Sequence, residues 1–232
     1  MPTLAGLGFS SKIPVGEHTL DNHMQWLNSV LKQLKLDELV FVGQDWGGPT
    51  GMGALAMSPG LLKGAVVLNT GFNAPTEERS ISRIHALVKT PVVGELLVET
   101  LGRGFSGLPD LQGDPTSMPE EIIHLYRQPL LDSGNGKAPL AMMRMVPDGP
   151  DHPSAEAMRF IAQYVEELDI PAEIVWGMRD PILGGLLFNM QENFPDAAVT
   201  ETQAGHFLQE EVPLEIAAAI LRVVNAAEQA GD

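Results

Sequence analysis

Short apolar runs alternate with longer amphipathic stretches along most of the chain. We expect strands at 39–44, 64–69, 172–176 and 197–202, of which the first is the most apolar. The run 39–44 shows no polar alternation, which is typical of a central parallel strand covered on both faces. Because helix-like stretches separate these runs, the pattern predicts an α/β fold with a mostly parallel central sheet.

The stretches between the predicted strands carry helix signals. Thr19 is a favoured N-cap residue, and the residues after it place leucines and a methionine on one stripe to about residue 36. The helix expected after the first strand is rich in glycine, at Gly47, Gly48, Gly51 and Gly53. Because glycine destabilises a helix, this excess indicates close packing against the sheet. Further helices are expected after residue 185 and from about residue 213.

The alternation stops between residues 73 and 168, where helical segments are broken by glycine and proline. This change predicts a helical cap inserted into the α/β core. We therefore divide the chain into a first core segment at 1–72, the cap at 73–168 and a second core segment at 169–232.

Composition limits the classes of protein to consider. The chain has 232 residues, of which 44% are apolar and 19% charged, so it can bury a sizeable core. A formal net charge of −16 argues against nucleic acid or an anionic membrane as a partner. Cysteine is absent, which rules out disulfides and thiolate chemistry. Since the sequence shows neither a signal peptide nor an apolar run of membrane-spanning length, we expect a soluble cytoplasmic protein.

The most informative stretch is VGQDWGG, which follows the first predicted strand. It places Asp45 on a sharp glycine-flanked turn before a helix, the geometry of a nucleophile elbow. A carboxylate that attacks a saturated carbon forms an ester that water can cleave, whereas serine would leave a stable ether. Asp45 therefore predicts displacement of a leaving group from sp3 carbon. The simpler alternative is an aspartate that only caps the following helix.

Two further polar residues follow later strands. Asp180 comes after the strand that ends in Trp176, and His206 comes after the strand at 197–202. Because sites in open α/β sheets form at the carboxyl ends of the strands, we expect Asp45, Asp180 and His206 to converge. Either later residue alone would more often be structural. Their order along the chain, nucleophile then acid then histidine, favours a catalytic triad.

These motifs resemble those of the α/β-hydrolase superfamily, and most closely those of the haloalkane dehalogenases. VGQDWGG resembles their nucleophile motif, WGMRDPILG their acid motif and AGHFLQEEVP their histidine motif. LAGLGFSSK and RMVPDGPDHPS resemble a loop and a cap segment, so the resemblance covers nearly the whole chain. Some dehalogenases carry the acid after the strand before the cap. Here that region reads NTGF and offers no carboxylate, which leaves Asp180.

The resemblance implies a hydrolase that acts on a small halogenated organic substrate. Asp45 would attack the carbon bearing the halogen, while the indole N–H of Trp46 binds the departing halide. His206, oriented by Asp180, would then activate the water that cleaves the ester. The backbone N–H of Trp46 is the candidate oxyanion donor. The alternative for its indole is core packing beneath the cap. No cofactor or metal is expected, and the other histidines show no ligand spacing.

Three alternatives stay open. An epoxide hydrolase would use the same triad but needs cap tyrosines, and Tyr126 and Tyr164 are the only tyrosines. A fluoroacetate-type dehalogenase needs cationic groups around its substrate, for which the cap offers Arg103, Arg127 and Arg144. The third alternative is a non-catalytic relative that serves as a binding module.

The chain also looks truncated at its N-terminus relative to the family. In the family, several strands and a His-Gly loop with an oxyanion donor precede the LAGLGFSSK-like loop. Their absence would leave the strand at 39–44 with an apolar edge, which favours association. Loss of one oxyanion donor typically costs about a hundred- to a thousandfold in rate. We therefore expect this chain to self-associate through that edge and to turn over slowly.

Overall fold

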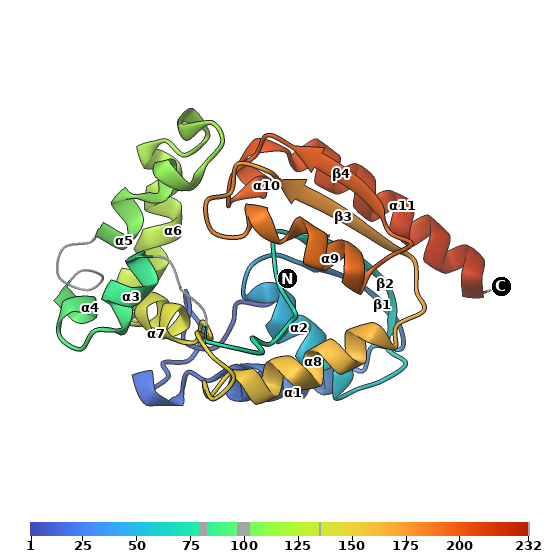
Figure 1. The fold of residues 1–232 in the computed structure, drawn as a ribbon, viewed down its shortest axis with the longest axis horizontal. Helices are drawn as coiled ribbons and strands as arrows, with labels where there is room; N and C mark the ends of the chain where they lie inside the picture. The colour runs from blue at the N-terminus through green and yellow to red at the C-terminus, as the bar shows by residue number, and fades with distance from the viewer. Residues whose placement is uncertain (79–82, 97–102, 135, 232) are drawn as a thin grey trace.

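Four parallel strands form a single sheet in the order β1-β2-β3-β4 (Figure 1). This computed structural model describes residues 1–78, 83–96, 103–134 and 136–231. The strands are β1 Leu39–Gly43, β2 Leu62–Leu68, β3 Ala172–Gly177 and β4 Ala198–Thr202. The four predicted strands and the parallel sheet are confirmed, with bounds that differ by one or two residues.

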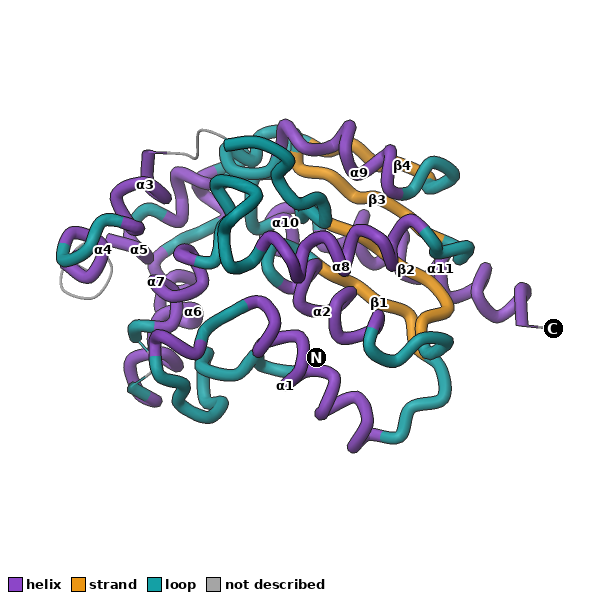
Figure 2. The backbone as a smooth tube through the Cα atoms, turned by 60° about the horizontal axis from the view of Figure 1, so that its bottom comes forward, coloured by secondary structure: helices purple, strands orange, loops and turns teal. Residues whose placement is uncertain are grey.

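Helices cover both faces of the sheet and also lie beyond one of its ends (Figure 1). They are α1 Leu20–Leu34, α2 Gly47–Ala56, α3 Arg83–Lys89, α4 Val93–Glu95, α5 Arg103–Ser106, α6 Glu120–Ser133, α7 Ala138–Arg144, α8 Ala155–Glu166, α9 Leu187–Asn193, α10 Leu208–Glu211 and α11 Pro213–Gly231. α2, α8 and α9 lie on one face of the sheet, with α1 packed beside α2, and α11 covers the other face (Figures 1 and 2). No described helix is both long and apolar enough to cross a membrane.

The N-cap of α1 and the glycines of α2 act as the sequence analysis predicts. The Thr19 side chain accepts a hydrogen bond from the backbone N–H of Asn22 at 3.1 Å, as expected of an N-cap. α1 ends at Leu34, two residues earlier than predicted, because Lys35 adopts the left-handed conformation. In α2, a Cβ atom on Gly53 would collide with the side chain of Met24 on α1. The glycines of α2 therefore allow close packing against α1 as well as against the sheet.

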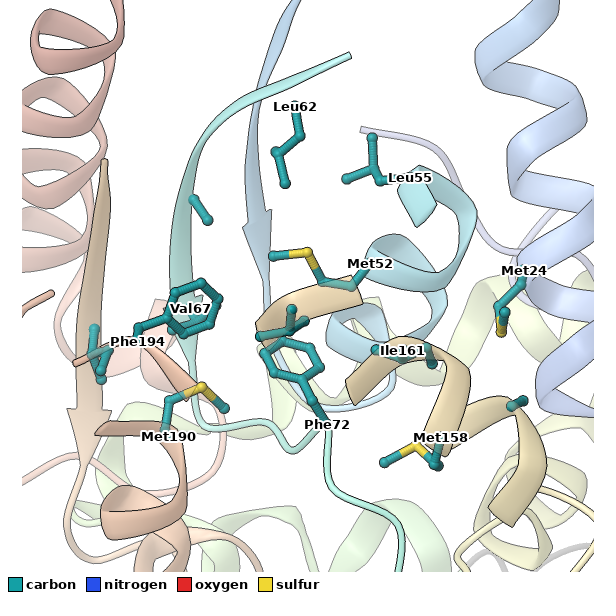
Figure 3. Packing of buried hydrophobic residues seen from close by; sticks show 14 of the residues in the cluster. Met24, Met52, Leu55, Leu62, Val67, Phe72, Met158, Ile161, Met190 and Phe194 are labelled. Carbon is teal, nitrogen blue, oxygen red and sulfur yellow. The ribbon is translucent and has the colours of Figure 1, made fainter. Parts of the chain in front are cut away.

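The main hydrophobic core lies between the sheet and the layer of α2, α8 and α9 (Figure 3). Its buried members include Met52 on α2, Val67 on β2 and Ile161 on α8. Phe72, just after β2, packs edge-on against Phe194, with 6.2 Å between the ring centroids. A second cluster fills the space between the opposite face of the sheet and α11.

β1 lies at one edge of the sheet. It pairs with β2, and within the described residues no strand pairs with its other side. Val42 is 40% exposed and the other residues of β1 before Gly43 are half-buried. The exposed edge expected for the strand at 39–44 is therefore present among the described residues. Self-association through this edge stays a prediction.

The described residues between β2 and β3 are mainly helical. α3 to α7 gather at the end of the molecule toward which the strands run, whereas α8 returns alongside α2 (Figures 1 and 2). Met158, Ile161 and Val165 of α8 belong to the main core. The end of this inserted segment is thereby fixed to the sheet.

We predict that Ile161→Ala lowers the free energy of unfolding by about 2 to 5 kcal/mol, because Ile161 is fully buried and its truncation leaves a cavity. Phe160→Ala, at the next position, is the matched control. Phe160 is 43% exposed, so its truncation should change stability by about 0.5 kcal/mol or less. Urea unfolding followed by circular dichroism measures both. Equal losses in the two variants would show that α8 does not pack as described.

Candidate functional site

Asp45 occupies the turn between β1 and α2. Its φ angle is +45°, in the left-handed region that non-glycine residues rarely adopt. Two contacts from the end of β2 hold this conformation. The backbone N–H of Asp45 donates to the carbonyl of Asn69 at 2.9 Å, and the Thr70 hydroxyl donates to the carbonyl of Asp45 at 2.8 Å. Such strained residues cluster at functional sites, where the surrounding structure maintains them.

The start of α2 argues against a simple capping role for Asp45. Trp46 is the N-cap residue, and no side chain caps the helix. Gly48 packs so tightly on Thr70 that a Cβ atom there would collide with the threonine side chain. The start of α2 thus depends on a small residue three positions after Asp45.

The Asp180 carboxylate is buried just beyond β3 and accepts hydrogen bonds on both oxygens. Oδ1 accepts from the backbone N–H groups of Ile182 at 2.7 Å and Leu183 at 3.1 Å. Oδ2 accepts from Asn69 Nδ2 at 2.9 Å and lies 3.0 Å from His206 Nδ1. Hydrogen bonds of this number and kind favour the ionised form of a carboxyl group.

His206 is buried just beyond β4 and is oriented by Asp180. Because an ionised carboxylate only accepts hydrogen bonds, His206 Nδ1 carries the proton and donates it to Asp180. Nε2 is then the ring nitrogen left to act as a base. The Phe207 ring stands edge-on to the imidazole, with 5.1 Å between the centroids.

The pKa values of the pair move in opposite directions. Burial alone lowers the pKa of His206, but the hydrogen bond to Asp180 and the negative charges of Asp45 and Asp180 outweigh burial and raise it above its usual value. Burial alone raises the pKa of Asp180, but the contacts with His206 and with two backbone N–H groups hold it below its usual value. Both shifts favour the ion pair, so the imidazole gains a proton more readily than a free histidine does.

The three predicted residues therefore converge. Asp180 and His206 are in direct contact, and Asp45 lies close enough for its charge to act on the imidazole. Each follows the carboxyl end of a parallel strand, as expected for a site in an open α/β sheet. Trp46 is half-buried, and its side chain packs against the main core.

Four polar residues at the site were missed by sequence reasoning. Asn69 was set aside because it is not a carboxylate, yet its amide joins the Asp180 carboxylate to the backbone of Gly177. Gln44, next to Asp45, donates to the carbonyl of His206 at 2.9 Å. The other two are Gln112 and Glu211. Gln112 bonds Phe207, and Glu211 bonds Gly113 as well as the nearby Gly205. Because the contacts between the two segments join residues more than ninety positions apart, no local pattern could have identified them.

The two tyrosines lie in different surroundings. The Tyr126 hydroxyl donates to the Glu210 carboxylate at 2.7 Å and accepts from Gln209 at 2.8 Å. Burial and the hydrogen bond with Glu210 raise the pKa of Tyr126 to about 12. Tyr164, on α8, packs against the main core.

The candidate cationic groups have partners where they are described. Arg127 lies 3.5 Å from Glu120, and Arg144 lies 2.8 Å from Glu95. The side chain of Arg103 falls outside the described residues. In the described part of the chain, no group of three or more histidine or acidic residues is placed to hold a metal ion.

Several known proteins are similar to this chain in fold and in sequence. The α/β hydrolase fold family matches residues 1–105. A haloalkane dehalogenase of Psychrobacter cryohalolentis is 26% identical over 97% of this chain and 73% of its own length. A solved haloalkane dehalogenase from Bradyrhizobium elkani superposes with a TM-score of 0.84 at 20% identity, over 99% of this chain and 81% of the other. The chain has the α/β-hydrolase fold and is similar in sequence to haloalkane dehalogenases.

The similarity extends to a relative with another activity. A cis-3-alkyl-4-alkyloxetan-2-one decarboxylase of Shewanella oneidensis is 27% identical over 93% of this chain and 70% of its own length. The resemblance to α/β-hydrolases and the fold class predicted from the sequence are thus confirmed. The choice of substrate among hydrolases of this type rests on the site.

We predict that Asp180→Asn lowers the pKa of His206, because the neutral amide removes a negative charge that favours the imidazolium ion. The imidazole signals in an NMR titration report this pKa. Asp169→Asn is the control, since this exposed residue precedes β3 at the opposite end from Asp180. An unchanged pKa in Asp180→Asn would mean that the pair is not formed in solution.

Proposed function

We propose that this hydrolase removes halide from haloalkanes through a covalent ester on Asp45. The observation that carries the proposal is the left-handed Asp45 turn within electrostatic range of the His206–Asp180 pair. A carboxylate at this elbow suits attack on saturated carbon, and a neighbouring histidine suits cleavage of the resulting ester. Relatives that are named haloalkane dehalogenases support the same reaction.

In the first step, a carboxylate oxygen of Asp45 forms a bond to the carbon that carries the halogen. The carbon–halogen bond breaks, and the halide leaves with the bonding electron pair. The indole N–H of Trp46, the residue next to the nucleophile, donates a hydrogen bond to the departing ion. This step needs no base, because Asp45 is already ionised.

In the second step, His206 Nε2 takes a proton from water, and the resulting hydroxide attacks the ester carbonyl of Asp45. The backbone N–H of Trp46 stabilises the tetrahedral oxyanion. The bond between the carbonyl carbon and the oxygen that carries the alkyl group then breaks, and the imidazolium of His206 gives its proton to that oxygen, which releases an alcohol. The Asp45 carboxyl group loses its proton to solvent and becomes a carboxylate again. Asp180 holds the imidazolium that forms in between. This step is faster above the raised pKa of His206, because only the neutral imidazole accepts the proton.

The inserted residues 73–168 form the cap of this proposal, with α3 to α7 at the end of the sheet where the triad lies (Figure 1). A cap in this place excludes water from the first step and shapes the pocket for the substrate. An epoxide hydrolase would need free tyrosine hydroxyls to protonate the epoxide oxygen. The Tyr126 hydroxyl instead donates to Glu210, so we favour the haloalkane.

We predict that Asp45→Asn abolishes halide release from 1,2-dibromoethane, because a neutral amide is a poor nucleophile and cannot form the ester. Asp37→Asn, on the exposed residue before β1, is the matched control and should keep parental turnover. Halide is measured with an ion-selective electrode, and mass spectrometry checks that the introduced amide has not deamidated back to a carboxylate. Full turnover in a verified Asp45→Asn protein would refute the proposal. If the parent protein releases no halide but converts an epoxide to a diol, its substrate is an epoxide. If it instead decarboxylates an oxetan-2-one, its substrate is that lactone.

Replacement of His206 should stop only the second step. His206→Phe should form an alkyl ester and retain it, since alkylation of Asp45 needs no base. Mass spectrometry of the peptide that contains Asp45 should show close to one alkyl group per chain, together with one equivalent of released halide. If the parent turns over and His206→Phe forms no adduct, then His206 is required earlier than this mechanism states.

A further inference from the structure

The inserted segment touches the backbone of the His206 turn directly. The N–H of His206 donates to the carbonyl of Leu111 at 2.8 Å. A Cβ atom on Gly205 would collide with the backbone of Leu111 and Gln112, and one on Gly113 would collide with the carbonyl of Gln203. Two segments about ninety residues apart in sequence therefore approach each other as closely as bare backbone allows.

The carboxylate of Glu211 joins these two segments. Oε2 accepts from the N–H of Gly205 at 2.6 Å and from the N–H of Gly113 at 3.1 Å. Oε1 accepts from the N–H of Asp114 at 2.6 Å. Hydrogen bonds to an ionised acceptor are roughly twice as strong as those between neutral groups. One half-buried charge at the end of α10 thus bonds the residue before His206 and two residues of the inserted segment.

The residue after His206 is held from the same inserted segment. Gln112 Oε1 accepts from the N–H of Phe207 at 2.9 Å, and its Nε2 donates to the carbonyl of Phe207 at 3.2 Å. Gln112 is itself buried. The backbone on both sides of the imidazole is therefore fixed by contacts that depend on residues 111–114 staying docked.

We propose that Glu211 is a positioning residue that docks the inserted segment 111–114 onto the His206 turn and thereby aligns His206 for ester cleavage. The proposal rests on the function proposed above. Because alkylation of Asp45 does not use His206, loss of Glu211 slows the second step and leaves the first. A misplacement of about 1 Å can cost about a hundredfold in rate, so a small loosening of this turn has a measurable effect.

Glu211→Gln is the test, with Glu210→Gln as the matched control. Both variants remove one negative charge from α10 at equal side-chain volume, and the Glu210 carboxylate bonds Tyr126 and not the His206 turn. In Glu211→Gln an amide NH2 replaces an oxygen that accepts from backbone N–H, so at least one of the three bonds is lost. In rapid-quench kinetics with 1,2-dibromoethane, Glu211→Gln should release a burst of halide equal to that of the parent protein. Hydrolysis of the Asp45 ester in Glu211→Gln should be about 10- to 100-fold slower than in the parent, so the ester should accumulate.

A readout without substrate separates this proposal from the proposed function. In ¹⁵N NMR of labelled histidine, Glu211→Gln should move the His206 imidazole signals and lower its pKa, because the contact with Asp180 loosens, while Glu210→Gln should not. If the parent releases no halide and His206→Phe traps no adduct, then the proposed function fails, and the NMR comparison still decides the role of Glu211. If folded Glu211→Gln hydrolyses the ester at the parent's rate, or if its His206 signals are unchanged, the positioning role is refuted.

Gly113→Ala perturbs the same contact from the inserted segment and leaves α10 intact. Its added methyl group collides with the backbone of Gln203, so it should reproduce the slow hydrolysis and the shifted His206 signals. Circular dichroism and thermal melting establish that each variant folds. If Glu211→Gln and Gly113→Ala both fail to fold, the proposal is also contradicted, because Glu211 would then maintain the fold as a whole and not the alignment of His206.

Discussion

The buried carboxylate of Asp180 is the constraint on which the site depends. An isolated carboxylate in this environment would cost several kcal/mol, so it must be surrounded by donors. Those donors come from its own loop, from Asn69 at the end of β2 and from His206 after β4. Satisfying one charge therefore brings together the carboxyl ends of three strands.

Asn69 extends this constraint to Asp45, the proposed nucleophile. Its side chain donates to Asp180, and its backbone carbonyl accepts from the N–H of Asp45. The left-handed turn at Asp45 and the orientation of His206 are thus supported by one fully buried residue at the end of β2. On the other side of the site, the inserted segment holds the backbone around His206, so the accuracy of the triad depends on contacts from both the sheet and the insertion.

Much of the fold could be predicted because its signals are local. The apolar runs located all four strands, the Thr19 cap located α1, and the glycines of α2 indicated its close packing. Asp180 and His206 were found in the same way, because each follows a strand in a distinctive motif. Local patterns do not encode partners that are distant in sequence, which is why Asn69, Gln112 and Glu211 were missed.

The central claim is that an oxygen of Asp45 becomes the oxygen of the product. A single turnover with excess enzyme in H2¹⁸O tests it most directly, with both the alcohol and the Asp45 peptide analysed by mass spectrometry. The two-step mechanism predicts an unlabelled alcohol and one ¹⁸O atom in the Asp45 carboxylate, because water attacks the ester carbonyl. A labelled alcohol and an unlabelled Asp45 would contradict it, because water would then have displaced the halide directly.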